Sequence, residues 1–295
     1  MKQQLGCIIA HSGEIERPDW ITLDNPLNVT YDLPVIGFGE LRRLSTQWHA
    51  DIAVVERAYC IDWVLKGIFD QPELARALVL CGSAALRYAH CPDYPVVEEP
   101  EFLAAPPVEQ ATLDAALTAA AQASGVRFTL IDFARTSAKV EYTGPLGRRS
   151  AAQPRIVLSF VPGQTRTEAS HAPLIHPFSD VCAATVSAVG LEEFAAERIA
   201  QLAQAPRARD VFDLWFVLTH ARERIDSSRT RGLARDIARA KNRALPRADP
   251  PFDPTRRAGL ERAWDRALQR VPGHPPFAQI ERDLIHELES IDLGG

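Results

Sequence analysis

Two stretches that lie close together in the chain decide the fold: L-V-L-C-G-S-A-A-L at residues 78–86 and V-V-E-E-P-E-F-L-A at residues 96–104. The first has the pattern of a short buried strand that Gly82 and Ser83 turn into a helix. A glycine at such a turn lets a phosphate group approach backbone N–H groups where the helix begins. The second predicts an acidic strand. Their order and closeness indicate a phosphate-binding site more strongly than either stretch alone.

The acidic strand brings two carboxylates together. Residues i and i+2 of a strand point to the same face, so Glu99 and Glu101 are expected to project side by side, about 7 Å apart at their Cα atoms. Like charges held in this way repel unless water, a cation or a basic group lies between them. Two such carboxylates can hold a divalent cation that bridges phosphates. The simpler alternative is a solvated end of an acidic strand.

The rest of the chain predicts an α+β protein in three parts. Residues 1–38 have no clear period and form an N-terminal extension of uncertain structure, and helical spacing begins at Gly39. Residues 39–189 form a mixed α/β domain, and residues 190–295 form an all-helical C-terminal domain. After the two stretches we expect a helix over 108–124 and strands over 126–133, 138–142, 155–161 and 181–186.

Bulk composition is that of a soluble globular protein. The chain has 295 residues and a mass of 32.6 kDa, with 46% hydrophobic and 24% charged residues. No apolar run reaches the roughly 18 residues that a membrane span needs, and the N-terminus does not have the pattern of a signal peptide. We therefore expect a cytoplasmic protein with no membrane partner. The five cysteines are scattered and never spaced as C-x-x-C, which predicts reduced, buried thiols.

Charge is distributed unevenly along the chain. The net charge is −5, yet residues 222–270 contain 14 Arg and Lys against 7 Asp and Glu. Four arginines follow one another at i,i+4 and would form a ridge on one helix face: Arg231, Arg235, Arg239 and Arg243. Such a ridge favours a polyanion such as RNA, or an acidic partner. The alternative is that acidic residues neutralise it.

A second polar group is expected on the late helices. Arg209 and Asp213 are spaced i,i+4 within the apolar stretch A-R-D-V-F-D-L-W-F-V-L, so they predict a half-buried ion pair. Such a pair either orders a neighbouring element or only braces two helices.

Several motifs together resemble one family. The stretches V-E-R-A-Y-C-I-D-W-V-L (55–65), L-V-L-C-G-S-A-A-L, E-P-E-F-L, P-R-I-V-L-S-F, H-P-F-S-D, L-E-E-F-A-A-E-R-I-A-Q-L and A-R-D-V-F-D-L-W-F-V-L occur in the family's order, from about residue 40 to about residue 220. The chain is similar to the AbiEii/AbiGii nucleotidyltransferase toxins, a branch of the polymerase-β-like nucleotidyltransferase superfamily. The last of these motifs is the most specific and the Gly-Ser turn the least.

The resemblance implies a mixed sheet with flanking helices, capped by a helical C-terminal domain. It also implies a Mg²⁺-dependent (or Mn²⁺-dependent) transfer of a nucleotide from an NTP to an RNA acceptor, tRNA being the expected one. Such toxins belong to type IV toxin–antitoxin and abortive infection systems, which implies a cognate antitoxin. Carried over to this chain, Gly82 and Ser83 bind the nucleotide with Arg198 and Asp210, and Glu99 and Glu101 hold the metal.

This chain departs from the family's pattern at that site. Glu99 and Glu101 stand where the family has aspartates, and Pro100 between them removes a ladder donor. The position of a third acidic residue corresponds to Ser159, and Arg198 replaces a lysine. An active enzyme would use Glu99, Glu101, Arg198 and Asp210 for catalysis. The alternatives are a catalytically degenerate homologue that binds nucleotide or RNA without turnover, and a protein whose helical half binds an antitoxin.

Overall fold

A computed structural model describes residues 36–95, 97, 99–147, 154–202, 206–242, 244–246, 251–269 and 271–292. The expected N-terminal extension therefore lies outside the described residues, apart from its last three positions. Ile36 is the first described residue, and it is buried in the core.

Within the described residues, the strands form one mixed sheet of seven in the order β3-β4-β5-β2-β1-β7-β6. Their bounds are β1 (Leu78–Cys81), β2 (Glu101–Ala104), β3 (Arg127–Ala134), β4 (Ser137–Thr143), β5 (Arg155–Pro162), β6 (Ser170–Pro173) and β7 (Thr185–Ala188). The interior strand β1 pairs antiparallel with the central strand β2 and parallel with β7, while β2 pairs parallel with β5. The expected α+β class is thus confirmed.

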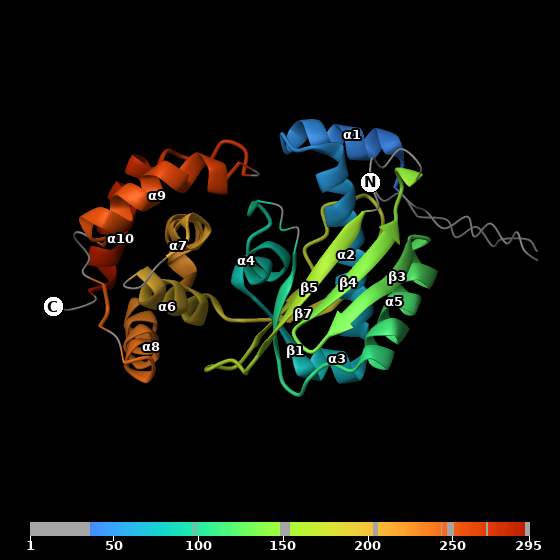
Figure 1. Ribbon diagram of the computed structural model, residues 1–295, viewed down its shortest axis with the longest axis horizontal. Coiled ribbons are helices and arrows are strands. Elements are labelled where there is room, and N and C mark those ends of the chain that lie inside the picture. Colours follow the sequence, from blue (N-terminus) through green and yellow to red (C-terminus); the bar gives the residue numbers. More distant parts are fainter. Residues whose placement is uncertain are drawn as a thin grey trace, which may run out of the picture. The chain divides into compact units, whose positions relative to one another are not determined.

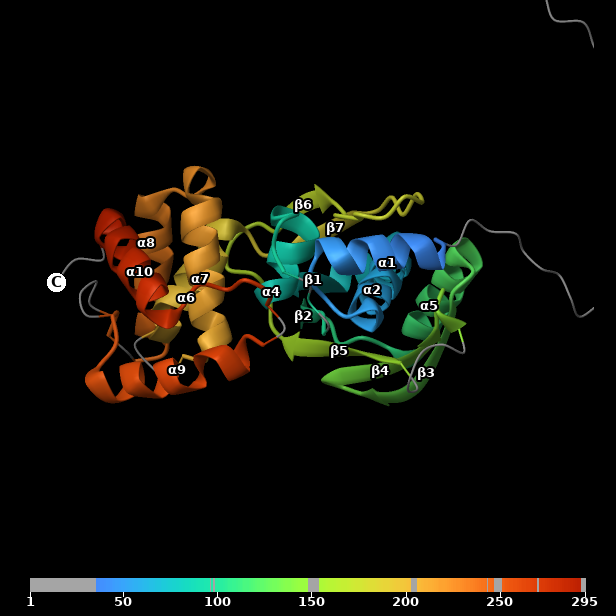
Figure 2. The same cartoon turned by 90° about the horizontal axis from the view of Figure 1, so that it is seen from above.

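Four helices belong to the sheet half: α1 (Phe38–Gln47), α2 (Ile52–Asp70), α3 (Pro72–Ala77) and α5 (Gln110–Ser124). Helices α2, α3 and α5 pack on strands of the sheet, and α1 packs on α2. Figures 1 and 2 show α2 and α5 lying along the same face of the sheet. Gly67 of α2 lies so close to α5 that a Cβ there would be 2.4 Å from the Ala116 carbonyl oxygen, so the glycine permits this close packing.

The chain after Gly190 is helical, as expected. Its helices are α6 (Leu191–Leu202), α7 (Ala208–His220), the short 3₁₀ helix η3 (Arg222–Arg224), α8 (Ser227–Ala240), α9 (Pro254–Ala267) and α10 (Phe277–Ile291). Asp226 caps α8 by accepting a hydrogen bond from Arg229 N, and Asp253 caps α9 in the same way. The helices pack on one another through apolar stripes that include Trp264, Leu284 and Leu288.

A buried ionic cluster fixes the loop between β6 and β7. His176 Nδ1 lies 2.8 Å from Asp62 Oδ2, and its Nε2 lies 2.7 Å from Asp180 Oδ1. The Tyr59 hydroxyl donates to the other Asp180 oxygen at 2.7 Å. Asp62 and Tyr59 belong to α2, so the H-P-F-S-D motif ties this loop to a core helix. We call these four residues the His176 cluster.

Two strand predictions need correction. The acidic strand begins only at Glu101, and Glu99 lies in a bend before it. Pro100 has no N–H to donate to a ladder, which accounts for the later start. The strand expected over 181–186 is instead β7, because the His176 cluster holds Asp180 in a loop and Val181 is 82% exposed. Strand β6 was not expected.

The described cysteines are the reduced, buried thiols that the sequence predicts. Cys60, Cys81, Cys91 and Cys182 are free and buried. None of the described helices is both long enough and apolar enough to cross a membrane.

Candidate functional site

The turn after β1 lies at the centre of the candidate site. Gly82 opens α4 (Gly82–Ala85), which continues into the π-helical turn η1 (Leu86–His90). Its φ is +56°, and a Cβ at this position would be 2.8 Å from Glu101 Oε2 and 3.5 Å from Arg198 Nη2. The carboxylate from β2 and the guanidinium from α6 therefore lie against the same backbone turn. This positive φ favours glycine, because residues with a Cβ rarely adopt it.

Asp213 links that turn to the helical half. Its side chain is fully buried on α7, and it accepts a hydrogen bond from the Ser83 hydroxyl at 2.8 Å. The Tyr94 hydroxyl donates to its other oxygen. Arg198 and Arg209 each approach Asp213 at 3.3 Å. We call these five residues the Asp213 cluster; the Arg209–Asp213 pair is partly buried, as the i,i+4 spacing predicted.

Tyr94 acts in this cluster as a donor. Burial is the main cause that raises the pKa of its phenol, and the nearby Asp213 charge raises it further. Tyr94 therefore stays protonated at neutral pH and can donate to the carboxylate.

Asp210 lies beside this cluster and is held by arginines. Arg207 Nε and Nη2 contact its two oxygens at 2.9 and 3.0 Å, and Arg198 Nη1 lies 3.7 Å away. Burial opposes ionisation of Asp210, but the Arg207 hydrogen bonds and the Arg198 charge outweigh it and lower the pKa of this carboxyl. The Arg207 side chain itself is 80% exposed. Glu101 is among the charges that raise the pKa of Arg207, so this exposed cation lies within electrostatic range of the Gly82 turn.

Arg198 is the cation that lies close to Asp213, Asp210 and the Gly82 turn. Its side chain is 9% exposed, its guanidinium lies 5.0 Å from the Phe194 ring centroid, and its Nε is buried without a hydrogen-bond partner among the described residues. A buried guanidinium with unused donors favours an anionic ligand.

The expected metal ligands are placed differently from one another. Glu101 is half-buried beside Gly82, whereas Glu99 is exposed. The register of β2 with β5 pairs Glu101 with Ser159, so a hydroxyl occupies the adjacent strand position. No group of three or more Asp, Glu, His or Cys that could hold a metal occurs in the part of the chain that the structure describes. Mg²⁺ commonly binds through one or two carboxylates together with substrate phosphates, and the residues present fit a site of that kind.

The basic ridge on α8 is partly neutralised. Arg231 pairs with Asp292 at 2.8 Å and Arg239 with Asp236 at 3.5 Å. Arg235 also has an interaction partner, and Arg243 lies outside the described residues. Local ion pairs thus offset part of the ridge's charge.

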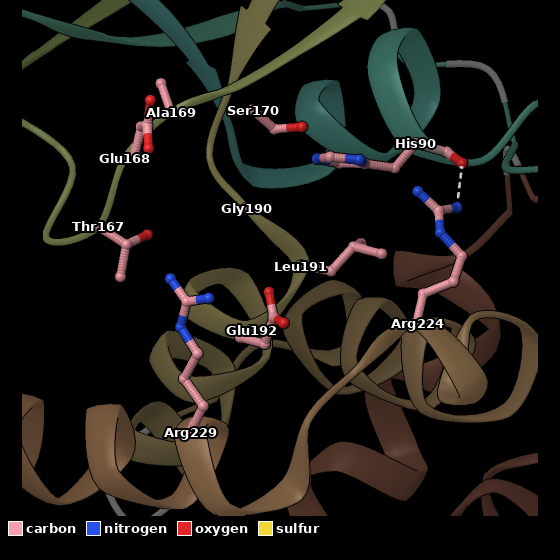
Figure 3. A pocket seen from close by; sticks show the side chains of 10 residues that line it. All are labelled: His90, Thr167, Glu168, Ala169, Ser170, Gly190, Leu191, Glu192, Arg224 and Arg229. Carbon is pink, nitrogen blue, oxygen red and sulfur yellow. Dashed lines mark hydrogen bonds between the residues drawn. The ribbon is translucent and has the colours of Figure 1, made fainter.

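A separate pocket of about 340 Å³ opens where the loop before β6 meets α6 and α8 (Figure 3). Arg224 donates to the His90 carbonyl at 2.8 Å, and the side chains of Arg229 and Glu192 are directed into the pocket. Glu168 lines it as well. Because two glutamates balance the two arginines, the lining gives no clear preference for an anion.

The sequence did not predict that Tyr94, Arg207 and Asp213 lie together at the site. Tyr94 stands between prolines in a loop with no period, and Arg207 precedes the helix motif that drew attention to Asp210. Asp213 was expected only as the partner of Arg209. The i,i+4 spacing could reveal that pair, but nothing in the sequence pattern connects it to Ser83.

Comparisons with known proteins agree with this architecture. A family model described as nucleotidyl transferase AbiEii toxin, type IV TA system, matches residues 63–283, which include the Gly82 turn and the Asp213 cluster. Among curated proteins, none matches this chain. The solved structure of MenT4, a nucleotidyltransferase toxin from Mycobacterium tuberculosis H37Rv, is similar with a TM-score of 0.50 and 15% identity, over 86% of this chain and 98% of that one. At that identity the likeness shows the fold. The family model spans most of the chain, from α2 into α10, and the chain belongs to the AbiEii family of nucleotidyltransferase toxins of type IV toxin–antitoxin systems.

Proposed function

We propose that this chain transfers a nucleotide from an NTP to an RNA acceptor, with tRNA as that acceptor. The observation that supports this best is the convergence of Glu101 and Arg198 on the Gly82 turn. At this partly exposed backbone turn, the carboxylate can hold a metal ion and the guanidinium can bind phosphate oxygens, which are the two needs of a metal-bound triphosphate.

In this proposal the triphosphate lies along the Gly82 turn. The backbone N–H groups of Gly82 and Ser83 donate to phosphate oxygens, since the Ser83 hydroxyl is already used in binding Asp213. Arg198 offsets triphosphate charge from the helical side. Arg207 is exposed, and its guanidinium can bind a phosphate group if it releases Asp210.

Glu101, with Glu99 two residues before it, would hold Mg²⁺ or Mn²⁺ in the loaded enzyme. The metal would supply positive charge at the phosphate oxygens, which are the ligands it still needs. Metal binding should therefore be much stronger with nucleotide than without it.

The reaction needs little covalent chemistry from the protein. An acceptor hydroxyl attacks the α-phosphorus, the bond to the β-phosphate oxygen breaks, and pyrophosphate leaves while the hydroxyl proton passes to solvent. The residues of this chain contribute by fixing the triphosphate and offsetting its charge. Ser159 cannot serve as a carboxylate base.

A specific observation favours a second candidate. Ser159 pairs with Glu101 where an acid would strengthen the metal site, and both Asp210 and Asp213 are already bound by arginines. A homologue of this kind would bind nucleotide or RNA, or an antitoxin, without turnover.

One experiment separates the two candidates. The protein is incubated with each α-labelled NTP and bulk tRNA, with Mg²⁺, Mn²⁺ or EDTA, and label is followed on RNA and on protein. Metal-dependent label on tRNA supports the transferase. NTP binding by calorimetry without any transfer supports the second candidate, and absence of NTP binding contradicts the transferase.

A further inference from the structure

A second pocket, away from the Gly82 turn, has a buried arginine in its wall. It measures about 300 Å³ and lies where α1, α2 and the loop before β2 meet the turn between α9 and α10. The residues that matter for the argument are Gln47, Trp48, Arg87, Asp93, Tyr94 and Pro272. We call it the Arg87 pocket.

Arg87 has more N–H donors than it has hydrogen-bond partners among the described residues. It is 3% exposed, and the hydrogen bond it donates is from Nη1 to the Pro92 carbonyl at 3.2 Å. Among the described residues, no carboxylate lies within ion-pairing distance of it. Asp62 attracts it from further away, but the Asp62 Oδ2 atom is bound to His176. A guanidinium has five N–H donors, so a buried one with a single bond favours an anion in the cavity that it lines.

The walls of the pocket suit a flat or apolar group. The guanidinium carbon of Arg87 lies 5.7 Å from the Trp48 ring centroid, and Trp48 is only partly buried. Four prolines line the pocket, and these rigid side chains lose little entropy when they contact a ligand: Pro92, Pro95, Pro177 and Pro272. The lining thus combines one cation with aromatic and aliphatic surface, which is the usual composition of a small-molecule site.

We propose that the Arg87 pocket binds a small planar molecule that bears one anionic group, a carboxylate or a monophosphate. The anion bonds Arg87, and the ring packs against Trp48 and the prolines. A single arginine and the exposed Asp93 disfavour a triphosphate here, so this ligand differs from the NTP of the proposed function. Tyr94 lines the pocket and also donates to Asp213, so the ligand would contact a residue of the Asp213 cluster.

The test uses three probes of one shape on the full chain: benzoate, phenyl phosphate and the neutral benzamide. Thermal shift and calorimetry should detect benzoate or phenyl phosphate in the millimolar range, and the stronger of the two identifies the anion. Benzamide should bind about tenfold more weakly, which corresponds to losing a charge-assisted hydrogen bond. Binding of neither anion, or equal binding of benzamide, overturns the proposal.

Two isosteric variants on exposed positions assign the binding to this pocket without disturbing the core. Asp93→Asn removes a negative charge and should strengthen benzoate binding, while Gln47→Glu adds one and should weaken it, each by about two- to threefold. Benzamide affinity should stay constant in both, and Gln47→Ala serves as the matched control for loss of the amide. Benzoate binding that responds to neither charge change places the anion elsewhere and overturns the proposal. Arg87→Met should abolish the preference for anions, and its folding is checked by circular dichroism.

Discussion

The Asp213 cluster and the His176 cluster both remove carboxylates from water, but they connect different parts of the molecule. Every member of the His176 cluster belongs to the sheet half, and its histidine is bound on both sides by carboxylates. The Asp213 cluster instead joins Ser83 and Tyr94 of the sheet half to α6 and α7. One cluster closes a loop onto a helix, and the other holds two halves of the chain at a shared turn.

The two clusters also differ in which hydrogen-bonding atoms are left without a partner. In the His176 cluster both imidazole nitrogens are bound, and the atom that has no hydrogen-bond partner among the described residues is a buried acceptor, Asp62 Oδ1. In the Asp213 cluster the atom without a partner is instead a donor, the buried Arg198 Nε, and the neighbouring Arg207 is exposed. Buried charge alone therefore does not identify a functional site. Cationic donors close to a backbone turn that can bind phosphate are the better sign.

Asp213→Asn should have the largest effect on both stability and binding. Asparagine keeps the shape but removes the buried charge that faces Arg198 and the partly exposed Arg209, so the free energy of unfolding should fall by about 3–5 kcal/mol. NTP affinity should fall as well, because Ser83 and Arg198 lose their shared anchor. Denaturant unfolding and calorimetry with NTP measure the two effects.

The control is Asp226→Asn, which changes an exposed helix cap. It should cost about 1 kcal/mol or less and leave NTP affinity unchanged. Wild-type NTP affinity in folded Asp213→Asn would show that the Asp213 cluster only braces the helices.

His176→Ala should affect stability without affecting nucleotide. Burial lowers the pKa of His176, but the hydrogen bonds to Asp180 and Asp62 outweigh it and raise the pKa from 6.5 to about 9. Removing the imidazole leaves two carboxylates facing each other, so we expect a loss of about 3 kcal/mol at neutral pH. NTP affinity of the folded protein should not change, and reduced affinity would contradict the separation of the two clusters.

The pH dependence has a definite sign. A folded-state pKa that is raised gives stability that is complete below pH 6.5 and is lost as the pH rises towards about 9. The wild-type protein should therefore lose stability across this window relative to His176→Ala. Chemical unfolding at several pH values measures this, and equal slopes for the two proteins would refute the protonated imidazole.

Gly82→Ala should have a smaller effect on stability and a specific one on the site. The positive φ costs a residue with a Cβ about 1–2 kcal/mol, and the new Cβ would meet the Glu101 carboxylate. We expect weaker metal-dependent NTP binding together with this modest loss in thermal denaturation. The matched variant Gly232→Ala lies in α8 with open space around it and should leave NTP binding unchanged. Undiminished NTP affinity in Gly82→Ala would remove the turn from the site.

We expect the smallest effect from substitutions on α8, and we expect it on tRNA binding. The double variant Arg235→Glu and Arg239→Glu should weaken tRNA binding and reduce the slope of log K against log salt by about two. The measurement is a salt titration of binding to labelled tRNA. An unchanged slope would mean that the local ion pairs leave no charge for RNA.

Sequence patterns could predict the elements that have strong periodicity. The alternation in β3, β4 and β5 and the alanine-rich α5 were visible in the sequence, with ends displaced by a few residues. Strands β6 and β7 were missed or misplaced: both are four residues long, and β6 is an edge strand that ends in a proline. Short strands without a continuous apolar run, unlike β1, depend on pairing rather than on their own sequence.

The sequence predicted those residues of the candidate site that belong to local motifs. The Gly-Ser turn and the acidic strand pointed to Gly82 and Glu101, and the helix motif pointed to Arg198. Tertiary packing decides the rest, since Ser83 and Tyr94 are 130 and 119 residues away from Asp213 in the chain. No periodicity links positions so far apart.

The most direct test of the central claim is Mg²⁺-dependent NTP binding to Glu101→Ala, compared with Glu99→Ala and with the exposed control Glu109→Ala. If Glu101 beside the Gly82 turn holds the metal–nucleotide, calorimetry should show no Mg²⁺-dependent binding in Glu101→Ala, reduced binding in Glu99→Ala and wild-type binding in Glu109→Ala. Unchanged Mg²⁺-dependent NTP affinity in a folded Glu101→Ala protein would contradict the account.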